Sequence, residues 1–197
     1  MPKPYQPNDK WSQKAAEEGY RARSVYKLME IDTRFRLLRH GMTVLDCGAA
    51  PGSWLQYVAQ KIGPKGKAIG IDTTDIEPIA DNVHLYRLDM MNEAALEAML
   101  AQENIHQFSV VLSDIAPNTT GIKDVDQWRS VELTEAVLVL AQKYLKPGGK
   151  CVMKVFRGAD FDEFLRKVKR DWKNVKVMTP KATRDRSFEV YVICEKH

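Results

Sequence analysis

The sequence predicts an α/β fold: a mostly parallel sheet of seven strands, with one antiparallel strand and helices on both faces. From residue 43 onward, apolar runs of strand length alternate with helical stretches, which is typical of a parallel sheet covered on both sides. The strand runs are almost continuously apolar, as expected for strands buried on both faces. The last two runs follow one another without a helix between them, which predicts a hairpin and one antiparallel strand.

The first forty residues predict a basic helical arm in front of this sheet. Helical stretches cover residues 11–18 and 24–36, and Ser24 stands where a helix N-cap is expected. A length of 197 residues matches one domain of about 100–200 residues. We therefore expect a single domain over residues 1–197, with residues 1–40 as its N-terminal arm.

The remaining elements follow in regular order up to the C-terminal hairpin, whose two strands are joined by the basic loop PKATRDRS. The expected strands are residues 43–47, 67–72, 83–88, 108–114, 150–156, 174–179 and 188–194. The expected helices after the arm are residues 53–62, 93–100, 126–145 and 161–170.

Composition indicates a folded protein without a membrane segment. Hydrophobic residues make up 44% and charged residues 28%, which are ordinary globular values. No stretch approaches the roughly 18–20 apolar residues that cross a bilayer, so we expect a cytoplasmic protein without a membrane partner. Cys47, Cys151 and Cys194 lie in apolar runs without CxxC spacing, so we expect reduced core residues and no metal site.

Charge is distributed unevenly along the chain. The net charge of +4 divides into +4 over residues 1–40, −8 over residues 41–142, +9 over residues 143–186 and −1 over residues 187–197. An acidic centre between two basic flanks suits a protein that binds a small cation in the middle and a polyanion across its ends. The alternative is that the basic residues only form solvated helix faces.

The strongest local motif is VLDCGAAPGSW, residues 44–54, where a strand runs into a glycine-rich turn and then a helix. Gly48 and Gly52 allow the backbone to approach a ligand closely. The turn lacks the middle glycine of the G-x-G-x-x-G motif, which brings the backbone against a pyrophosphate. A nucleoside without phosphates therefore fits this turn better than a dinucleotide.

Four aspartates stand at the ends of the first four strands: Asp46, Asp72, Asp89 and Asp114. Ligands of open α/β sheets bind outside the carboxyl ends of the strands, so we expect these acids to converge there and to favour a cation. S-adenosylmethionine is a nucleoside without phosphates and carries a sulfonium charge. The sequence thus predicts a Rossmann-like, S-adenosylmethionine-dependent methyltransferase fold; the alternative is that the aspartates cap helices and turns.

Two charged residues interrupt apolar strands near this edge. Lys154 lies within CVMKVF and Glu189 within FEVYVIC. A lysine in a buried strand is rarely tolerated without a partner, so we expect a carboxylate such as Asp114 beside Lys154. A purely structural ion pair would explain both residues equally well.

Several motifs together resemble the FtsJ-like ribosomal RNA 2′-O-methyltransferases: GAAPGSW, SDIAPN, KVFRG, the RSVYKLMEI helix and RSFEVY. The likeness extends from Trp11 to the last strand. It implies a catalytic tetrad of Lys27, Asp114, Lys154 and Glu189. With the turn, it implies a cofactor site of Gly48, Ala50, Pro51, Gly52, Ser53, Trp54, Asp72, Asp89 and Asp114, where Ser53 replaces the glycine usual in bacterial members.

The resemblance implies methyl transfer from S-adenosylmethionine to the ribose 2′-hydroxyl of a uridine in large-subunit ribosomal RNA. The implied partner is this RNA within the large subunit or its precursor, bound by a monomer. Two alternatives remain open: a transfer RNA 2′-O-methyltransferase, and a non-catalytic ribosome-assembly factor.

The implied methyl transfer gives the four tetrad residues a chemical role. A ribose hydroxyl is a very weak acid, so its proton must be removed or its loss eased as the O–C bond forms. A neutral Lys154 would do this, if desolvation and the nearby Lys27 deprotonate it while Asp114 and Glu189 orient the two amines. Alternatively, Lys154 stays protonated and steers the hydroxyl. Neither route requires a metal.

The basic flanks are the candidate RNA-binding surface, with Arg21, Arg23, Arg184 and Arg186 as the expected contacts. The aromatic residues of the arm are candidates for base stacking, although packing is the commoner use of such residues. The wider basic set comprises Lys27, Arg34, Arg36, Arg166, Lys167, Lys169, Arg170 and Lys181, and the aromatic set Tyr5, Trp11, Tyr20 and Tyr26.

Overall fold

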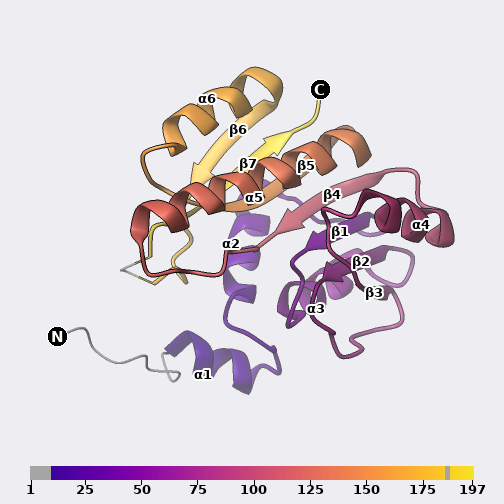
Figure 1. The fold of residues 1–197 in the computed structure, drawn as a ribbon. Helices are drawn as coiled ribbons and strands as arrows, with labels where there is room; N and C mark the ends of the chain where they lie inside the picture. The colour runs from indigo at the N-terminus through magenta and orange to yellow at the C-terminus, as the bar shows by residue number, and fades with distance from the viewer. Residues whose placement is uncertain (1–9, 185–186) are drawn as a thin grey trace.

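Seven strands form one sheet in the order β3-β2-β1-β4-β5-β7-β6, which confirms the fold class expected from the sequence (Figure 1). The structure is a computed structural model that describes residues 10–184 and 187–197. Tyr5 and Arg186 lie outside the described residues. The strands are β1 (Thr43–Cys47), β2 (Lys67–Asp72), β3 (Val83–Arg87), β4 (Phe108–Ser113), β5 (Leu145–Phe156), β6 (Lys173–Met178) and β7 (Glu189–Glu195). The helices are α1 (Lys10–Glu17), α2 (Val25–Phe35), α3 (Ser53–Ile62), α4 (Glu93–Glu103), α5 (Lys123–Tyr144) and α6 (Phe161–Asp171).

Strand β7 is the antiparallel strand of the sheet. It pairs antiparallel with β6, as the missing helix between the two strands predicts, and it also pairs antiparallel with β5. All pairs among β1 to β5 are parallel. In the β5–β7 pair Lys154 lies opposite Tyr191, which brings the last strand to the edge where β1, β2, β4 and β5 end.

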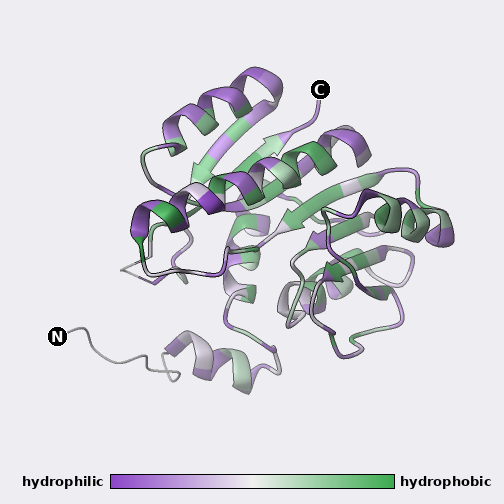
Figure 2. Ribbon diagram, in the orientation of Figure 1, coloured by the Kyte–Doolittle hydropathy of each residue, from purple (hydrophilic) through white to green (hydrophobic). Residues whose placement is uncertain are grey.

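The helices form one layer on each face of the sheet. Helices α1, α2 and α3 contribute to a core on one face, together with Leu112 and Tyr191. Helices α4, α5 and α6 contribute to the core on the other face, together with Val111 and Met153. Figure 2 shows the apolar strands between helices whose outer surfaces are hydrophilic. Strands β1, β2, β4 and β7 are mainly buried, which explains their nearly continuous apolar runs, whereas β6 at the edge of the sheet is mostly exposed.

Strand register places the expected acids on one face of the sheet. Asp46 of β1 is paired with Gly70 of β2 and Leu112 of β4. Side chains two residues apart on a strand lie on the same face. Asp72 and Asp114, each two residues further on, therefore lie on the same face as Asp46, the one that α2 and α3 cover.

Two details of the expected elements differ in the structure. Ser24 precedes α2, but its side chain does not cap the helix, because its hydroxyl lies 2.9 Å from the Ser53 hydroxyl instead. Strand β5 begins at Leu145 rather than near residue 150, with an irregular register between Phe108 and Val110 of β4. The three cysteines are buried and free, as expected.

Candidate active site

A cavity of about 470 Å³ lies at the carboxyl ends of β1, β2 and β4. Five of the residues expected to bind the cofactor line it: Gly48, Ala50, Asp72, Asp89 and Asp114. Its other walls include the apolar side chains Ile71, Leu88, Met90, Ile115 and Leu133. A volume of this size is within the range of small-molecule sites, and the combination of acids with apolar walls suits a nucleoside that bears a positive charge.

The glycine-rich turn is held in place by the acid that ends β2. The Asp72 carboxylate accepts hydrogen bonds from the backbone N–H groups of Ala50 at 2.9 Å and Thr74 at 2.8 Å. Gly48 has a φ of +71°, and a Cβ there would lie 3.0 Å from Ile115 Cβ. The turn therefore needs glycine at position 48 for its backbone angle and for its close approach to the next loop.

Asp46 is the unusual group beneath this cavity. Its side chain is buried, and neither carboxyl oxygen accepts a hydrogen bond from any residue that the structure describes. Burial, followed by the charges of Asp114 and Asp72, raises the pKa of the Asp46 carboxyl well above its ordinary value. A polar group left without a partner in this position fits a site that is completed by a bound polar molecule.

The remaining turn residues expected to bind the cofactor do not line the cavity. Pro51 is exposed after a cis peptide bond, and the space above Gly52 is occupied by Ile76, Ile79 and Arg21. The side chains of Ser53 and Trp54 are buried and point to the loop before α2. There the Trp54 indole donates to the Ser24 carbonyl at 2.8 Å, beside the contact between the Ser53 and Ser24 hydroxyls.

Lys154 forms the ion pair that its place in the sequence predicts. Its side chain is 8% exposed, and its Nζ lies 3.1 Å from Asp114 Oδ1 and 2.5 Å from the Asp114 backbone carbonyl. The Tyr191 hydroxyl donates to the same Oδ1 at 2.5 Å. The Asp114 carboxylate thus joins β4, β5 and β7 at the edge of the cofactor cavity.

The second lysine of the tetrad pairs with its second acid. Lys27 Nζ of α2 donates to Glu189 Oε1 of β7, and both side chains are only about one-tenth exposed. Lys27 Nζ also lies 5.8 Å from the centre of the Tyr191 ring. The structure therefore brings all four tetrad residues together around Tyr191.

Tyr191 was not singled out by the sequence analysis. It is fully buried, and burial followed by the charges of Asp114 and Glu189 raises the pKa of its hydroxyl above the ordinary value. The hydroxyl therefore stays protonated and acts as a donor. The signal available in the sequence was its position two residues after Glu189, which places both side chains on one face of the strand.

A second cavity of about 440 Å³ opens beside the Lys27–Glu189 pair. Arg23 and Arg184 lie on its walls with Ser24 and Ser187, so two of the expected RNA-contacting arginines border the tetrad. Arg23 also donates to the Ala182 carbonyl, which connects the arm to the loop before β7.

The wider basic set divides between the two faces of the sheet. The basic residues of α6, from Arg166 to Arg170, lie on the helix that packs on the face opposite α2. The arm's aromatic residues pack on one another, with ring centres 5.2 Å apart for Trp11 and Tyr26 and 6.4 Å apart for Tyr20 and Tyr26.

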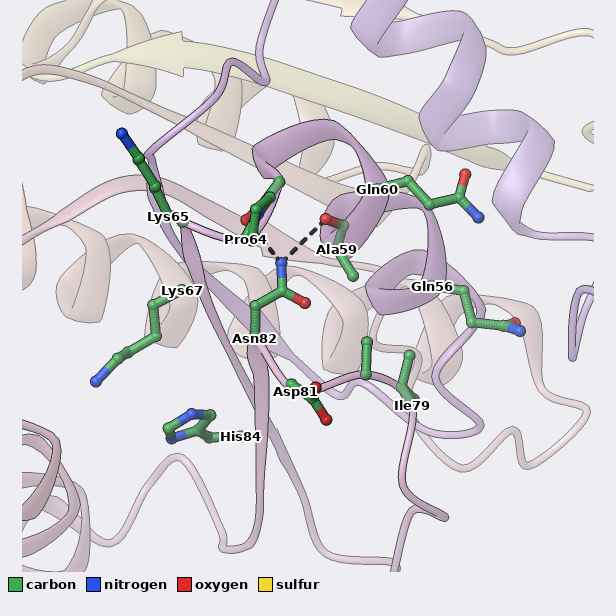
Figure 3. A pocket seen from close by; sticks show the side chains of 13 residues that line it. Gln56, Ala59, Gln60, Pro64, Lys65, Lys67, Ile79, Asp81, Asn82 and His84 are labelled. Carbon is green, nitrogen blue, oxygen red and sulfur yellow. Dashed lines mark hydrogen bonds between the residues drawn. The ribbon is translucent and has the colours of Figure 1, made fainter.

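A larger cavity of about 800 Å³ lies elsewhere, at the C-terminal end of α3 and the loops before β2 and β3 (Figure 3). Its polar groups serve the fold: the Asn82 amide donates to the Ala59 and Gly63 carbonyls. Lys67 and His84 both contact Glu103. None of the tetrad residues lines this cavity.

Among residues 10–184 and 187–197, no group of three or more His, Cys, Asp or Glu side chains has the geometry to hold a metal ion. No helix within these ranges is long and apolar enough to cross a membrane.

The sheet order, the glycine-rich turn after β1 and the acids at the ends of β1 to β4 define a Rossmann-like, S-adenosylmethionine-dependent methyltransferase. The sequence model of the FtsJ-like methyltransferases matches residues 20–197, and the chain belongs to this family.

Relatives and solved structures agree with this assignment. The chain is 44% identical over 186 residues to ribosomal RNA large subunit methyltransferase E of Azoarcus sp. (strain BH72), with 94% of this chain and 90% of the relative covered. It is 43% identical over 194 residues to the protein of that name from Myxococcus xanthus, with 98% and 91% covered. A ribosomal RNA methyltransferase structure from Plasmodium falciparum superimposes with a TM-score of 0.80 at 28% identity, covering 90% of this chain and 98% of that one. A Clostridium thermocellum structure, at 18% identity and a TM-score of 0.61, shares the fold and covers 87% of this chain and 97% of its own.

Proposed function

We propose that this protein transfers a methyl group from S-adenosylmethionine to the ribose 2′-hydroxyl of a uridine in large-subunit ribosomal RNA. The names of the relatives support the RNA class. The observation that carries the proposal is the Lys154–Asp114 pair. Asp114 lines the cavity for the cofactor, and the other pair of the tetrad, Lys27 and Glu189, lines the cavity bordered by arginines.

The cofactor cavity provides the groups that the proposal requires. Asp72 and Asp89 are the acids for the hydroxyl and amino groups of the nucleoside, and Ile115 and Leu133 offer an apolar surface to its ring. When bound, the cofactor supplies an electrophilic methyl group on a sulfonium. Asp114 lines the same cavity and holds Lys154, so the amine lies at the boundary between cofactor and acceptor.

The contacts of Lys154 fit a role as general base. Its amine donates to the Asp114 carbonyl and carboxylate, which uses both N–H donors of an uncharged amine. One lone pair then remains to accept the proton of the 2′-hydroxyl. The buried position, with Tyr191 donating to the same carboxylate oxygen, fixes the direction of this amine.

Lys27 and Glu189 support the acceptor side of the site. Glu189 holds the Lys27 ammonium at the wall of the second cavity, where a positive charge stabilises the oxygen as it loses its proton. Arg23 and Arg184 on the same wall are suited to backbone phosphates on either side of the target ribose. Holding hydroxyl and methyl group in line is worth up to about 7–11 kcal/mol in such reactions.

We further propose that the enzyme acts in the cytoplasm as a monomer, on the large subunit or its precursor. Residues 1–197 form one methyltransferase domain with residues 1–40 as its arm. The basic arm and the loop before β7 then contact the RNA from two sides of the tetrad.

The test uses large ribosomal subunits from a strain that lacks its own enzyme of this family. We expect the purified protein to add one 2′-O-methyluridine to the large-subunit RNA, detected by mass spectrometry of nucleosides. Methylation of transfer RNA alone would favour the transfer RNA enzyme. Cofactor binding without methylation of either RNA would favour an assembly factor and would overturn the proposal.

A further inference from the structure

Arg21 lies in the loop between α1 and α2, and its guanidinium donates three of its five N–H groups to backbone carbonyls of two other loops. Nη1 donates to the Pro51 carbonyl at 3.0 Å and to the Glu77 carbonyl at 2.8 Å. Nη2 donates to the Pro78 carbonyl at 2.8 Å. The charged end of this arginine therefore faces the protein, although the residue as a whole is exposed.

The two loops that Arg21 joins each form part of the cofactor cavity wall, through Gly48 and Ala50 of one and Thr73 of the other. Pro51 belongs to the glycine-rich turn, and Glu77 and Pro78 belong to the loop that leaves β2 after Asp72. Between them Gly52 has a φ of +101°, and a Cβ there would lie 2.8 Å from Ile79 Cδ1 and 3.0 Å from Arg21 Nη1. The loops are therefore closely packed where the guanidinium reaches them.

Asp72 joins the same two loops from the cavity side. Its carboxylate accepts from Ala50 N of the turn and from Thr74 N of the loop after β2. Arg21 and Asp72 thus hold one pair of loops from opposite sides, the arginine through carbonyls and the aspartate through N–H groups. Asp72 has its remaining acceptor capacity for a ribose hydroxyl.

The backbone around Arg21 is fixed to the helix that follows the turn. Arg21 N donates to Gln56 Oε1 at 2.9 Å, and the Gln56 amide donates to the Gly19 carbonyl at 3.0 Å. Three residues further on, Ser24 contacts Ser53 and Trp54 of α3. These hydrogen bonds therefore hold the loop before α2 against the helix that follows the glycine-rich turn.

We propose that Arg21 is a positioning residue for the cofactor, which keeps the two walls of the cavity joined, and that it makes no essential contact with RNA phosphates. A planar guanidinium reaches three carbonyls from two nitrogens, whereas a lysine amine offers one nitrogen in another position. This inference rests on the assignment of the cavity to S-adenosylmethionine and replaces the phosphate contact that the basic sequence around Arg21 suggests.

The experiment compares Arg21→Ala and Arg21→Lys with Arg39→Ala, which removes an exposed arginine of the arm near the opposite end of the sheet. Calorimetry with S-adenosylmethionine should show affinity lower by about tenfold or more in both Arg21 variants and unchanged in the control. The KM for the cofactor should rise while kcat at saturating cofactor is nearly retained. Added methylguanidinium should restore part of the affinity of Arg21→Ala, and methylammonium should not.

The salt dependence of RNA binding can contradict the inference. The slope of log RNA affinity against log salt should be the same for Arg21→Ala and the wild type. A flattened slope together with unchanged cofactor affinity would show a phosphate contact and overturn the inference, as would unchanged cofactor affinity alone. If Arg21→Ala does not fold, Arg21→Lys keeps the charge and decides the matter by the same calorimetry. Because calorimetry needs no RNA, its result is separate from a failure of the proposed methyl transfer.

Discussion

Lys154 and Tyr191 face each other across the β5–β7 pair, and both bind Oδ1 of Asp114. One carboxylate oxygen thus receives a lysine amine and a phenol from adjacent strands. We propose that Tyr191 is a positioning residue, because its hydroxyl holds the Asp114 carboxylate that binds Lys154.

Tyr191→Phe tests this role, because the ring is kept and only the donor to Asp114 is lost. We expect kcat to fall by about tenfold, with cofactor affinity unchanged. Unchanged kcat in a folded Tyr191→Phe protein would make Tyr191 only a packing residue.

Asp46 predicts a distinct pH dependence of stability. Burial raises the pKa of the Asp46 carboxyl in the folded state. The contribution of this carboxyl to stability is therefore fully present below its pKa in the unfolded chain, and it is lost as pH rises through its pKa in the folded state. Asp46→Asn removes this loss. The free energy of unfolding of the variant should therefore gain on that of the wild type from pH 5 to pH 8, by at most about 1.4 kcal/mol per pH unit.

Urea denaturation of both proteins at several pH values measures this difference directly. Because the comparison is between slopes, a constant offset caused by the amide does not affect it. Parallel curves for the two proteins would show that Asp46 is not protonated in the folded chain.

Arg184 borders the second cavity and predicts a salt effect on RNA binding. Arg184→Ala should reduce the slope of log affinity against log salt by about 0.7, the value for one phosphate of a single strand. Lys146→Ala, which removes an exposed charge at the start of β5, should leave the slope unchanged. Equal slopes for all three proteins would place Arg184 away from the phosphates.

The fold was predictable from the sequence because most strands are short apolar runs followed by a helix or a turn. It also predicted the Lys154–Asp114 pair, since a lysine in a buried strand requires a partner. The Lys27–Glu189 pair joins residues 162 positions apart, and only the family resemblance connected them beforehand.

Other features had only a weak signal in the sequence. The spacing of Tyr191 from Glu189 places both side chains on one face of the strand, but nothing local shows where the Tyr191 hydroxyl points. Arg21 looks like a phosphate contact, because its partners are backbone carbonyls, which any residue type provides. Ser24 has the residue type of an N-cap, but its hydroxyl is used by Ser53 of another helix. Such tertiary contacts override local preference.

The most direct test of the account is the single-turnover rate of Lys154→Ala on large subunits that lack the modification. Because the amine acts mainly in the transition state, the rate should fall by about 10²–10⁴-fold or more while calorimetric affinity for S-adenosylmethionine stays nearly unchanged. Lys154→Arg should not restore the rate, since a guanidinium remains protonated. A folded Lys154→Ala protein that methylates its RNA at a near-wild-type rate would contradict the account and leave the Lys154–Asp114 pair as a structural ion pair.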